Sequence, residues 1–209
     1  MPEPAYQAAR EQRTRRDDLD GSWVSALAEL TERIRRLARA AALTEVDGDA
    51  LRTVSETIAA ATAALDERRR SGPLLGDFDQ GRISVDNGRR IGATNTLVAP
   101  LEIEVDTYGA VARYHPDPLL EGAAGLLHGG TAAWLMDCMC GLLIEELDLT
   151  SRTANLTLDY RAPTPIDAEL TLRSAIDRRE GRKLWLRGSI EAAGRITVEA
   201  SGLFIMLRS

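Results

Sequence analysis

A single long apolar helix surrounded by strand-like segments is the feature of this sequence that most limits its fold. The sequence favours a helix from about residue 129 to 147, and one acid, Asp137, interrupts its most apolar stretch, from Thr131 to Ile144. Segments typical of strands lie on both sides of the helix, at 96–106, 110–115, 152–161, 169–177, 183–192 and 195–207. Tight turns of hairpin length join the later segments. Together these features predict an α+β fold in which an antiparallel sheet wraps around the central helix.

The N-terminal part of the chain has a different pattern. Residues 1–20 are polar and are expected to form a disordered arm. Two apolar stripes with alternating spacings of three and four predict a helical hairpin over 21–70, packed either on the main domain or on a second copy of the chain. The stripes consist of Leu27, Leu30, Ile34, Leu37 and Ala41, and of Leu51, Val54, Ile58, Ala61 and Leu65. Residues 71–94, rich in Gly and Asp, are interpreted as a linker to a main domain over 95–209.

Charge and cysteine content exclude several classes of protein. A net charge of −6 argues against a nucleic-acid-binding protein, because phosphate contacts need a basic surface. The two cysteines, Cys138 and Cys140, point to different sides of the expected helix, so neither a disulfide framework nor a shared metal site is expected. The N-terminus does not resemble a signal peptide, and an apolar stretch of about 14 residues is too short to span a membrane. A cytoplasmic location is therefore expected.

The start of the central helix is the first candidate for chemistry. His128 is followed directly by Gly129 and Gly130, so the backbone N–H groups that open the helix have no side chains in front of them. Such groups, aided by the helix dipole, can bind a carbonyl oxygen that gains negative charge during a reaction. The pattern therefore favours an oxyanion site built from the main chain.

Asp137 is the second candidate, because an acid on an otherwise apolar helix face is unfavourable unless it has a task or a partner. Its neighbours one turn away are Ala133, Trp134, Cys140 and Gly141. One interpretation of this pattern is a catalytic base. The other is a structural acid that is satisfied by a hydrogen bond in the core.

Two motifs resemble a known family. His128-Gly-Gly, with Asp137 nine residues after the histidine, is similar to the signature of the PaaI-type thioesterases. Thr153-Ala-Asn-Leu-Thr-Leu-Asp-Tyr-Arg-Ala-Pro-Thr-Pro165 is similar to the strand that follows their central helix. The resemblance covers about residues 95–207 and implies the hot-dog fold, with the helical hairpin as an addition. It also implies hydrolysis of an acyl-CoA or a similar thioester, without a metal or an organic cofactor.

The resemblance assigns roles to individual residues. Asp137 would be the nucleophile or the general base, and Gly129, assisted by Gly130, would polarise the thioester carbonyl through its N–H. Thr153 would hold the attacking water or the acid, and His128 would shape the turn. The residues expected to bind substrate are Gly130, Trp134, Asn155 and Arg161. The loop 121–125 departs from the family pattern, because it lacks the asparagine that many relatives carry before His-Gly-Gly.

The spacing of the two candidate groups predicts a dimer. Gly129 and Asp137 are eight residues apart, or about 12 Å along a helix axis, so they cannot both contact one thioester group. Either they do not cooperate, or two-fold symmetry brings Gly129 of one subunit near Asp137 of the other. The second case predicts a homodimer or a dimer of dimers. The alternative functions are a hot-dog hydratase or dehydratase, and a non-catalytic regulator that binds acyl-CoA.

Overall fold

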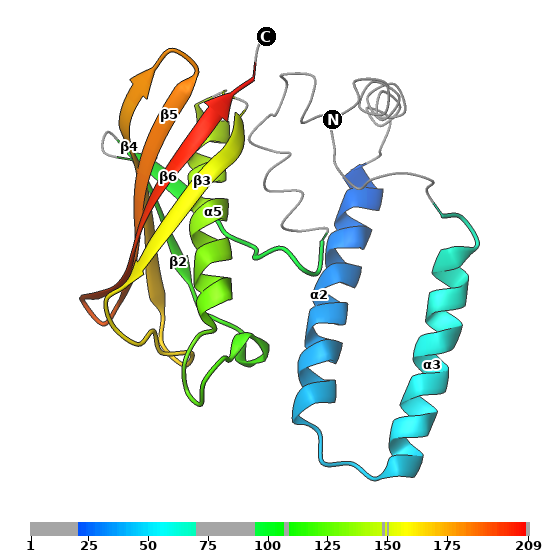
Figure 1. Cartoon of the computed structure of the whole chain (residues 1–209). Coiled ribbons are helices and arrows are strands. Elements are labelled where there is room, and N and C mark those ends of the chain that lie inside the picture. Colours follow the sequence, from blue (N-terminus) through cyan, green and yellow to red (C-terminus); the bar gives the residue numbers. More distant parts are fainter. Residues whose placement is uncertain (1–20, 70–94, 107–108, 148, 150, 208–209) are drawn as a thin grey trace.

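The computed structural model describes residues 21–69, 95–106, 109–147, 149 and 151–207. Figure 1 shows a sheet with one helix against it and two further helices to the side. The arm predicted for 1–20 and the linker predicted for 71–94 lie outside the described residues.

Six antiparallel strands form one sheet. They are β1 (Ile103–Asp106), β2 (Gly109–Tyr114), β3 (Ser151–Tyr160), β4 (Leu170–Glu180), β5 (Lys183–Ala192) and β6 (Arg195–Met206). Their order across the sheet is β1-β2-β4-β5-β6-β3, so β1 and β3 are its edges. The predicted strand segments match these strands closely, except for the segment 96–106.

The strand predicted over 96–106 is wrong in its first part, because the strand begins only at Ile103. The backbone carbonyls of Asn95 and Val98 accept hydrogen bonds of 2.8 Å from the guanidinium of Arg35. The N–H of Leu101 turns back to the carbonyl of Ala99 at 2.8 Å. These backbone groups are satisfied outside the sheet, so pairing with β2 starts later than the apolar pattern suggested.

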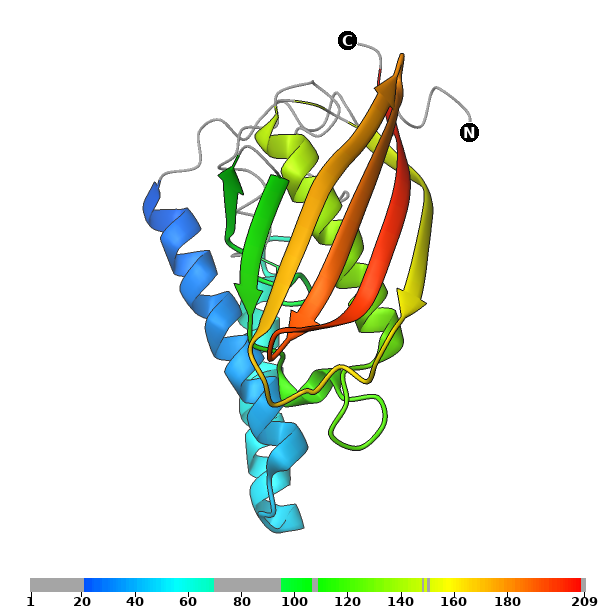
Figure 2. The ribbon, with the colours of Figure 1, turned by 90° about the vertical axis from the view of Figure 1, so that its left-hand side faces the viewer.

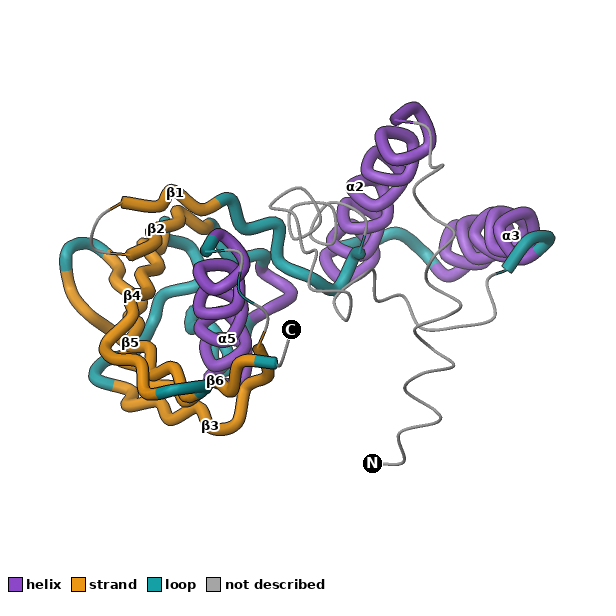
Figure 3. The backbone as a smooth tube through the Cα atoms, turned by 90° about the horizontal axis from the view of Figure 1, so that it is seen from above, coloured by secondary structure: helices purple, strands orange, loops and turns teal. Residues whose placement is uncertain are grey.

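The central helix, α5 (Gly129–Glu146), lies inside the curve of the sheet. Figure 3 shows the strands arranged in an arc around it. Its buried side consists of Ala132, Leu135, Met136, Met139, Cys140, Leu143 and Ile144. The strands supply the opposing layer with alternate residues, such as Leu170 and Leu172 of β4, both fully buried. This arrangement confirms the predicted hot-dog fold. No helix in the described part of the chain is long and apolar enough to cross a membrane.

Two helices precede the sheet, α2 (Gly21–Leu43) and α3 (Gly48–Asp66), which confirms the predicted N-terminal hairpin. Figures 1 and 2 show them running in opposite directions, with α2 nearer the sheet. Asp47 caps α3, because its carboxylate accepts a hydrogen bond of 2.9 Å from the N–H of Ala50.

The apolar stripes of the hairpin remain largely exposed in the single chain. Ile34 and Leu37 of α2 are 39% and 38% exposed, and Leu51 and Ile58 of α3 are 46% and 40% exposed. Within α3 no residue is buried. Of the two burial partners expected for these stripes, the main domain therefore contributes little, and a second copy stays a prediction.

Candidate active site

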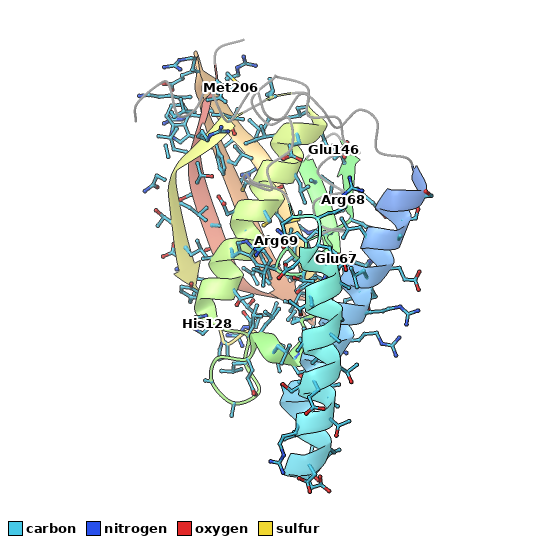
Figure 4. The ribbon with its side chains drawn as sticks, turned by 90° about the vertical axis from the view of Figure 1, so that its right-hand side faces the viewer. Glu67, Arg68, Arg69, His128, Glu146 and Met206 are labelled. Carbon is cyan, nitrogen blue, oxygen red and sulfur yellow. The ribbon has the colours of Figure 1, made fainter. Side chains whose placement is uncertain are left out.

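His128 caps the start of α5 (Figure 4). Its Nδ1 atom accepts a hydrogen bond of 3.0 Å from the N–H of Gly130. The N–H of Gly130, predicted to assist at the oxyanion site, is therefore already engaged. The N–H of Gly129 has no acceptor among the described residues. The structure thus leaves Gly129 as a free donor at the positive end of the helix dipole.

The loop before α5 holds the turn formed by His128, Gly129 and Gly130 from two sides. On one side the carbonyl of Leu120 accepts a hydrogen bond of 2.9 Å from the N–H of His128. On the other side the N–H of Leu127 donates to the carbonyl of Thr164 at 2.9 Å. The position of Gly129 is therefore set by contacts with two separate parts of the chain.

The loop 121–125, which lacks the asparagine that many PaaI-type thioesterases carry, is held compact by local hydrogen bonds. The carboxylate of Glu121 accepts a hydrogen bond of 2.6 Å from the N–H of Gly125. Gly125 has a φ of 76°, in the left-handed region that favours glycine. The N–H of Gly122 donates to the carbonyl of Leu126 at 2.9 Å. Glu121 thus makes an internal contact that helps to keep this loop compact.

Tyr160 contacts the same turn, although no sequence pattern singled it out. Its hydroxyl donates a hydrogen bond of 2.7 Å to the carbonyl of Gly129. A side chain at Gly129 would be crowded, because a Cβ there would lie 3.3 Å from the Tyr160 hydroxyl oxygen. The only available signal was that Tyr160 belongs to the second motif, 153–165. Nothing in that motif places its end beside the start of the helix.

Asp137 and Thr153 meet as the two motifs suggested. The Oγ1 of Thr153 donates a hydrogen bond of 2.8 Å to the Oδ1 of Asp137. Asp137 is half-buried rather than buried, and Thr153 is exposed on the edge strand β3. The register of β3 shifts between Thr153 and Asn155, which marks a bulge, and bulges often redirect a side chain beside a functional site. Among the described residues, the second oxygen of Asp137 has no partner.

The other predicted substrate-binding residues do not join these groups within one chain. Trp134 is half-buried and packs against the core. The side chain of Asn155 accepts a hydrogen bond of 3.2 Å from a threonine two residues further on. Arg161 forms ion pairs with Glu199 at 2.6 Å and with Asp159 at 3.1 Å. The hydrogen bond to Glu199 raises the pKa of Arg161. Arg161 is thus bound to carboxylates of its own sheet.

Three other ionisable groups on α5 have shifted pKa values. Burial, with a further effect of the charge on Asp137, raises the pKa of the Cys138 and Cys140 thiols to about 12. Neither thiol is therefore a suitable nucleophile at neutral pH. Burial, and then the neighbouring charge of Glu146, raises the pKa of Glu145 to about 7. Glu145 lies about two turns beyond Asp137 and forms no part of the same group.

Two hollows on the sheet surface lie away from the candidate groups. One of about 370 Å³ is lined by residues of β2, β4, β5 and β6, including Arg173 and Arg187. Another, of about 450 Å³, includes Asn155. Neither contains Gly129 or Asp137. The helix start and the acid together offer an oxyanion donor and a base, which the residues lining these two hollows do not combine.

Comparisons with known proteins find thioesterases. Residues 124–199 match the model of the family described as the thioesterase superfamily. Acyl-coenzyme A thioesterase THEM4 of Bos taurus is 35% identical over 104 residues, which are 49% of this chain and 43% of that protein. The protein of the same name from Xenopus laevis is 35% identical over 99 residues, 46% of this chain and 45% of that protein. The chain spans less than half the length of these curated relatives.

A solved structure extends the similarity to the N-terminal helices. It is a crystal structure described as a thioesterase superfamily protein, 26% identical to this chain, with a TM-score of 0.72. The match covers 86% of this chain and 94% of that one. Residues 95–209 alone could not supply this coverage, so the match includes part of the chain before the sheet.

Proposed function

We propose that this chain, whose residues 124–199 match the thioesterase-superfamily model, hydrolyses an acyl-CoA thioester to a free acid and CoA. The observation that carries this proposal is the 2.8 Å hydrogen bond from Thr153 to Asp137. It joins the acid of the first motif to the hydroxyl of the second and leaves one carboxylate oxygen available for chemistry. The acyl-coenzyme A thioesterases among the relatives support CoA esters as the substrate class.

We propose that the active site is shared between two subunits. Gly129 and Asp137 are eight residues apart on α5, or about 12 Å along the axis, which is too far for both to contact one thioester group. Strand β3 is an edge of the sheet that the described residues form, where it pairs with β6 on one side only. Its other side is therefore suited to pair with a second copy of the chain. A two-fold dimer built in this way would hold two equivalent sites.

In the proposed reaction, the N–H of Gly129 from one subunit donates a hydrogen bond to the thioester carbonyl oxygen. This contact strengthens as negative charge develops on that oxygen. Asp137 of the other subunit either takes a proton from the attacking water or attacks the carbonyl carbon itself to form a mixed anhydride. In both cases the C–S bond breaks and CoA leaves as a thiolate that takes up a proton. Water supplies the second oxygen of the free acid, directly in the first case and, in the second, by hydrolysing the anhydride, which breaks its bond to Asp137 and restores the carboxylate.

The role of Thr153 follows from its contact with Asp137. Its hydroxyl engages Oδ1, so Oδ2 is the oxygen that would face the water or the substrate. Tyr160 would hold the turn that carries Gly129 through its bond to the Gly129 carbonyl. Both cysteines are free thiols, which suits the reducing cytoplasm that we propose as the location of the protein.

A thiol-release assay on a panel of CoA esters tests this function. Wild-type protein should release CoA, and Asp137→Asn should lower kcat roughly 10²- to 10⁴-fold, because it removes the base or nucleophile but keeps the size of the side chain. Asp167→Asn is the matched control, since Asp167 is an exposed acid outside the candidate site. Hydration of an enoyl-CoA without CoA release would support a hydratase. Binding of CoA esters without any turnover would support a regulator.

A further inference from the structure

Helix α2 contacts the rest of the chain partly through a polar face. Thr31, Arg35 and Arg39 recur every four residues and therefore share one side of the helix. Thr31 is only 2% exposed, although it is polar. Arg35 donates hydrogen bonds of 2.8 Å to the backbone carbonyls of Asn95 and Val98. This face holds α2 against the segment that leads into β1.

Arg39 extends the same face to the loop that precedes α5. Its Nε and Nη2 atoms donate to the Oδ2 of Asp117 at 2.9 and 2.6 Å. The Oδ1 of Asp117 accepts a hydrogen bond of 2.9 Å from the N–H of Leu119 and so caps the short 3-10 helix η1 (Pro118–Leu120). Desolvation raises the pKa of Asp117, but the hydrogen bonds from Arg39 and Leu119 outweigh it and lower the pKa. Asp117 is therefore a charged link between α2 and η1.

The end of η1 is bonded in turn to the candidate oxyanion site. The carbonyl of Leu120 accepts a hydrogen bond of 2.9 Å from the N–H of His128. His128 caps α5 and directly precedes the free N–H of Gly129. A continuous series of contacts therefore leads from Arg39, through Asp117 and η1, to the peptide group that would bind the substrate oxygen.

Contacts other than that of Arg39 also hold the loop. Leu127, at the other end of the loop, donates to the carbonyl of Thr164 at 2.9 Å. Tyr160 holds the Gly129 carbonyl at 2.7 Å. Loss of the Arg39 contact would leave both of these anchors in place. It would free only the η1 side of the turn.

We propose that Arg39 is a positioning residue for the reaction, so that helix α2 contributes to the active site. Through Asp117 and η1 it sets the direction of the Gly129 N–H. The proposal rests on the proposed function, because it concerns the same turn. A donor that acts on the transition state must be held in place, so a small displacement of the turn lowers kcat more than it raises KM.

A double-mutant cycle tests the coupling between Arg39 and Asp117. Arg39→Gln removes the charged fork, and Asp117→Asn removes the charge but keeps an oxygen that can cap η1. Each change should lower kcat about two- to fivefold with little change in KM. The effect should be modest because the Arg39 side chain is 52% exposed, and ion pairs exposed to solvent contribute little free energy. The double variant should be no slower than either single variant, because both changes break one contact.

Arg33→Gln is the matched control. Arg33 is on the same helix, and its described ion pair is with Glu29 of that helix at 2.6 Å. This variant should keep wild-type kcat. If both single variants keep full kcat, or if their effects multiply in the double variant, the proposal is overturned. A lower unfolding temperature with unchanged kcat would also overturn it, because it would show a purely structural role.

Amide hydrogen exchange over residues 117–130 gives a readout that does not need activity. Exchange should be faster in Arg39→Gln and Asp117→Asn than in Arg33→Gln, since the first two release the η1 side of the turn. If the wild-type protein hydrolyses no CoA ester, the proposed function fails, but this difference in exchange would still support the positioning contact. Equal exchange in all three variants would overturn the contact even if the enzyme is active.

Discussion

Thr153→Val is a sharp test of the Asp137 site, because valine keeps the β-branched shape and removes only the hydrogen-bond donor. In the structure this donor lies 2.8 Å from the Oδ1 of Asp137, a normal length for a bond to a carboxylate. Hydrogen bonds to charged groups contribute about 1.5–3 kcal/mol, and the lower end applies here because Thr153 is exposed in the single chain. If the bond acts fully in the transition state, kcat of Thr153→Val should fall about tenfold.

The measurement is the initial rate of CoA release at saturating substrate, with Thr157→Val as the control. Thr157 is exposed on the same strand, and its hydroxyl donates to Asn155 at 3.2 Å rather than to Asp137. Thr157→Val should keep kcat within about twofold, and both variants should unfold near the wild-type temperature, because exposed substitutions change stability by less than about 0.5 kcal/mol. Full turnover in Thr153→Val would show that the hydroxyl has no part in the reaction.

Four further predictions concern the turn, the pH response, the domain division and the shared site. Tyr160→Phe removes the 2.7 Å bond to the Gly129 carbonyl, so kcat should fall about two- to tenfold, and an unchanged kcat would refute the role. Because the pKa of Glu145 rises from 4.5 to about 7 on folding, stability is lost as pH increases through this range. Glu145→Gln should therefore raise the unfolding temperature at pH 8 and leave it nearly unchanged at pH 4; equal shifts at both would contradict the burial effect. If 95–209 is the independent domain that we propose, a chain that begins near residue 75 should stay folded and dimeric. Its solubility and its kcat should be lower than those of the full chain. Aggregation of every such chain would refute the proposed domain division. Asp137→Asn and Gly130→Val should each be dimeric and inactive. Their mixture should recover roughly a quarter of wild-type turnover, because each mixed dimer contains one site without either change. Mixed dimers that are shown to form but have no activity would place the site within one chain.

The fold could be predicted where local pattern and burial agree. The helix expected over 129–147 is present as Gly129–Glu146, because its apolar side can be buried only against the sheet. The prediction failed at 96–102, where Arg35, about 60 residues earlier in the chain, binds the backbone carbonyls. A contact over that separation leaves no trace in periodicity. The same limit explains why the apolar stripe of α2 did not identify the polar contacts that this helix makes through Arg35 and Arg39.

The candidate site could be predicted where its residues are close in sequence. The order of His128, Gly129 and Asp137 on one helix is read directly from the motif, and the second motif contains Thr153. The engagement of the Gly130 N–H could not be predicted, because it depends on how the His128 ring is oriented. Arg39 was missed for another reason, since it contacts Asp117 across 78 residues of chain. Motif spacing identifies the candidate groups, but long-range contacts decide which of their atoms are free.

Strand β3 links the two halves of the candidate site. Near its start Thr153 bonds to Asp137, and at its end Tyr160 bonds to Gly129. Within the described sheet its outer side has no neighbouring strand. If two copies of β3 pair antiparallel about residue 156, the start of one strand lies opposite the end of the other. The Asp137 end of each subunit then lies beside the Gly129 end of its partner. An edge strand that contacts both groups would therefore solve the problem set by their spacing on α5, and the same pairing that forms the dimer would complete both sites.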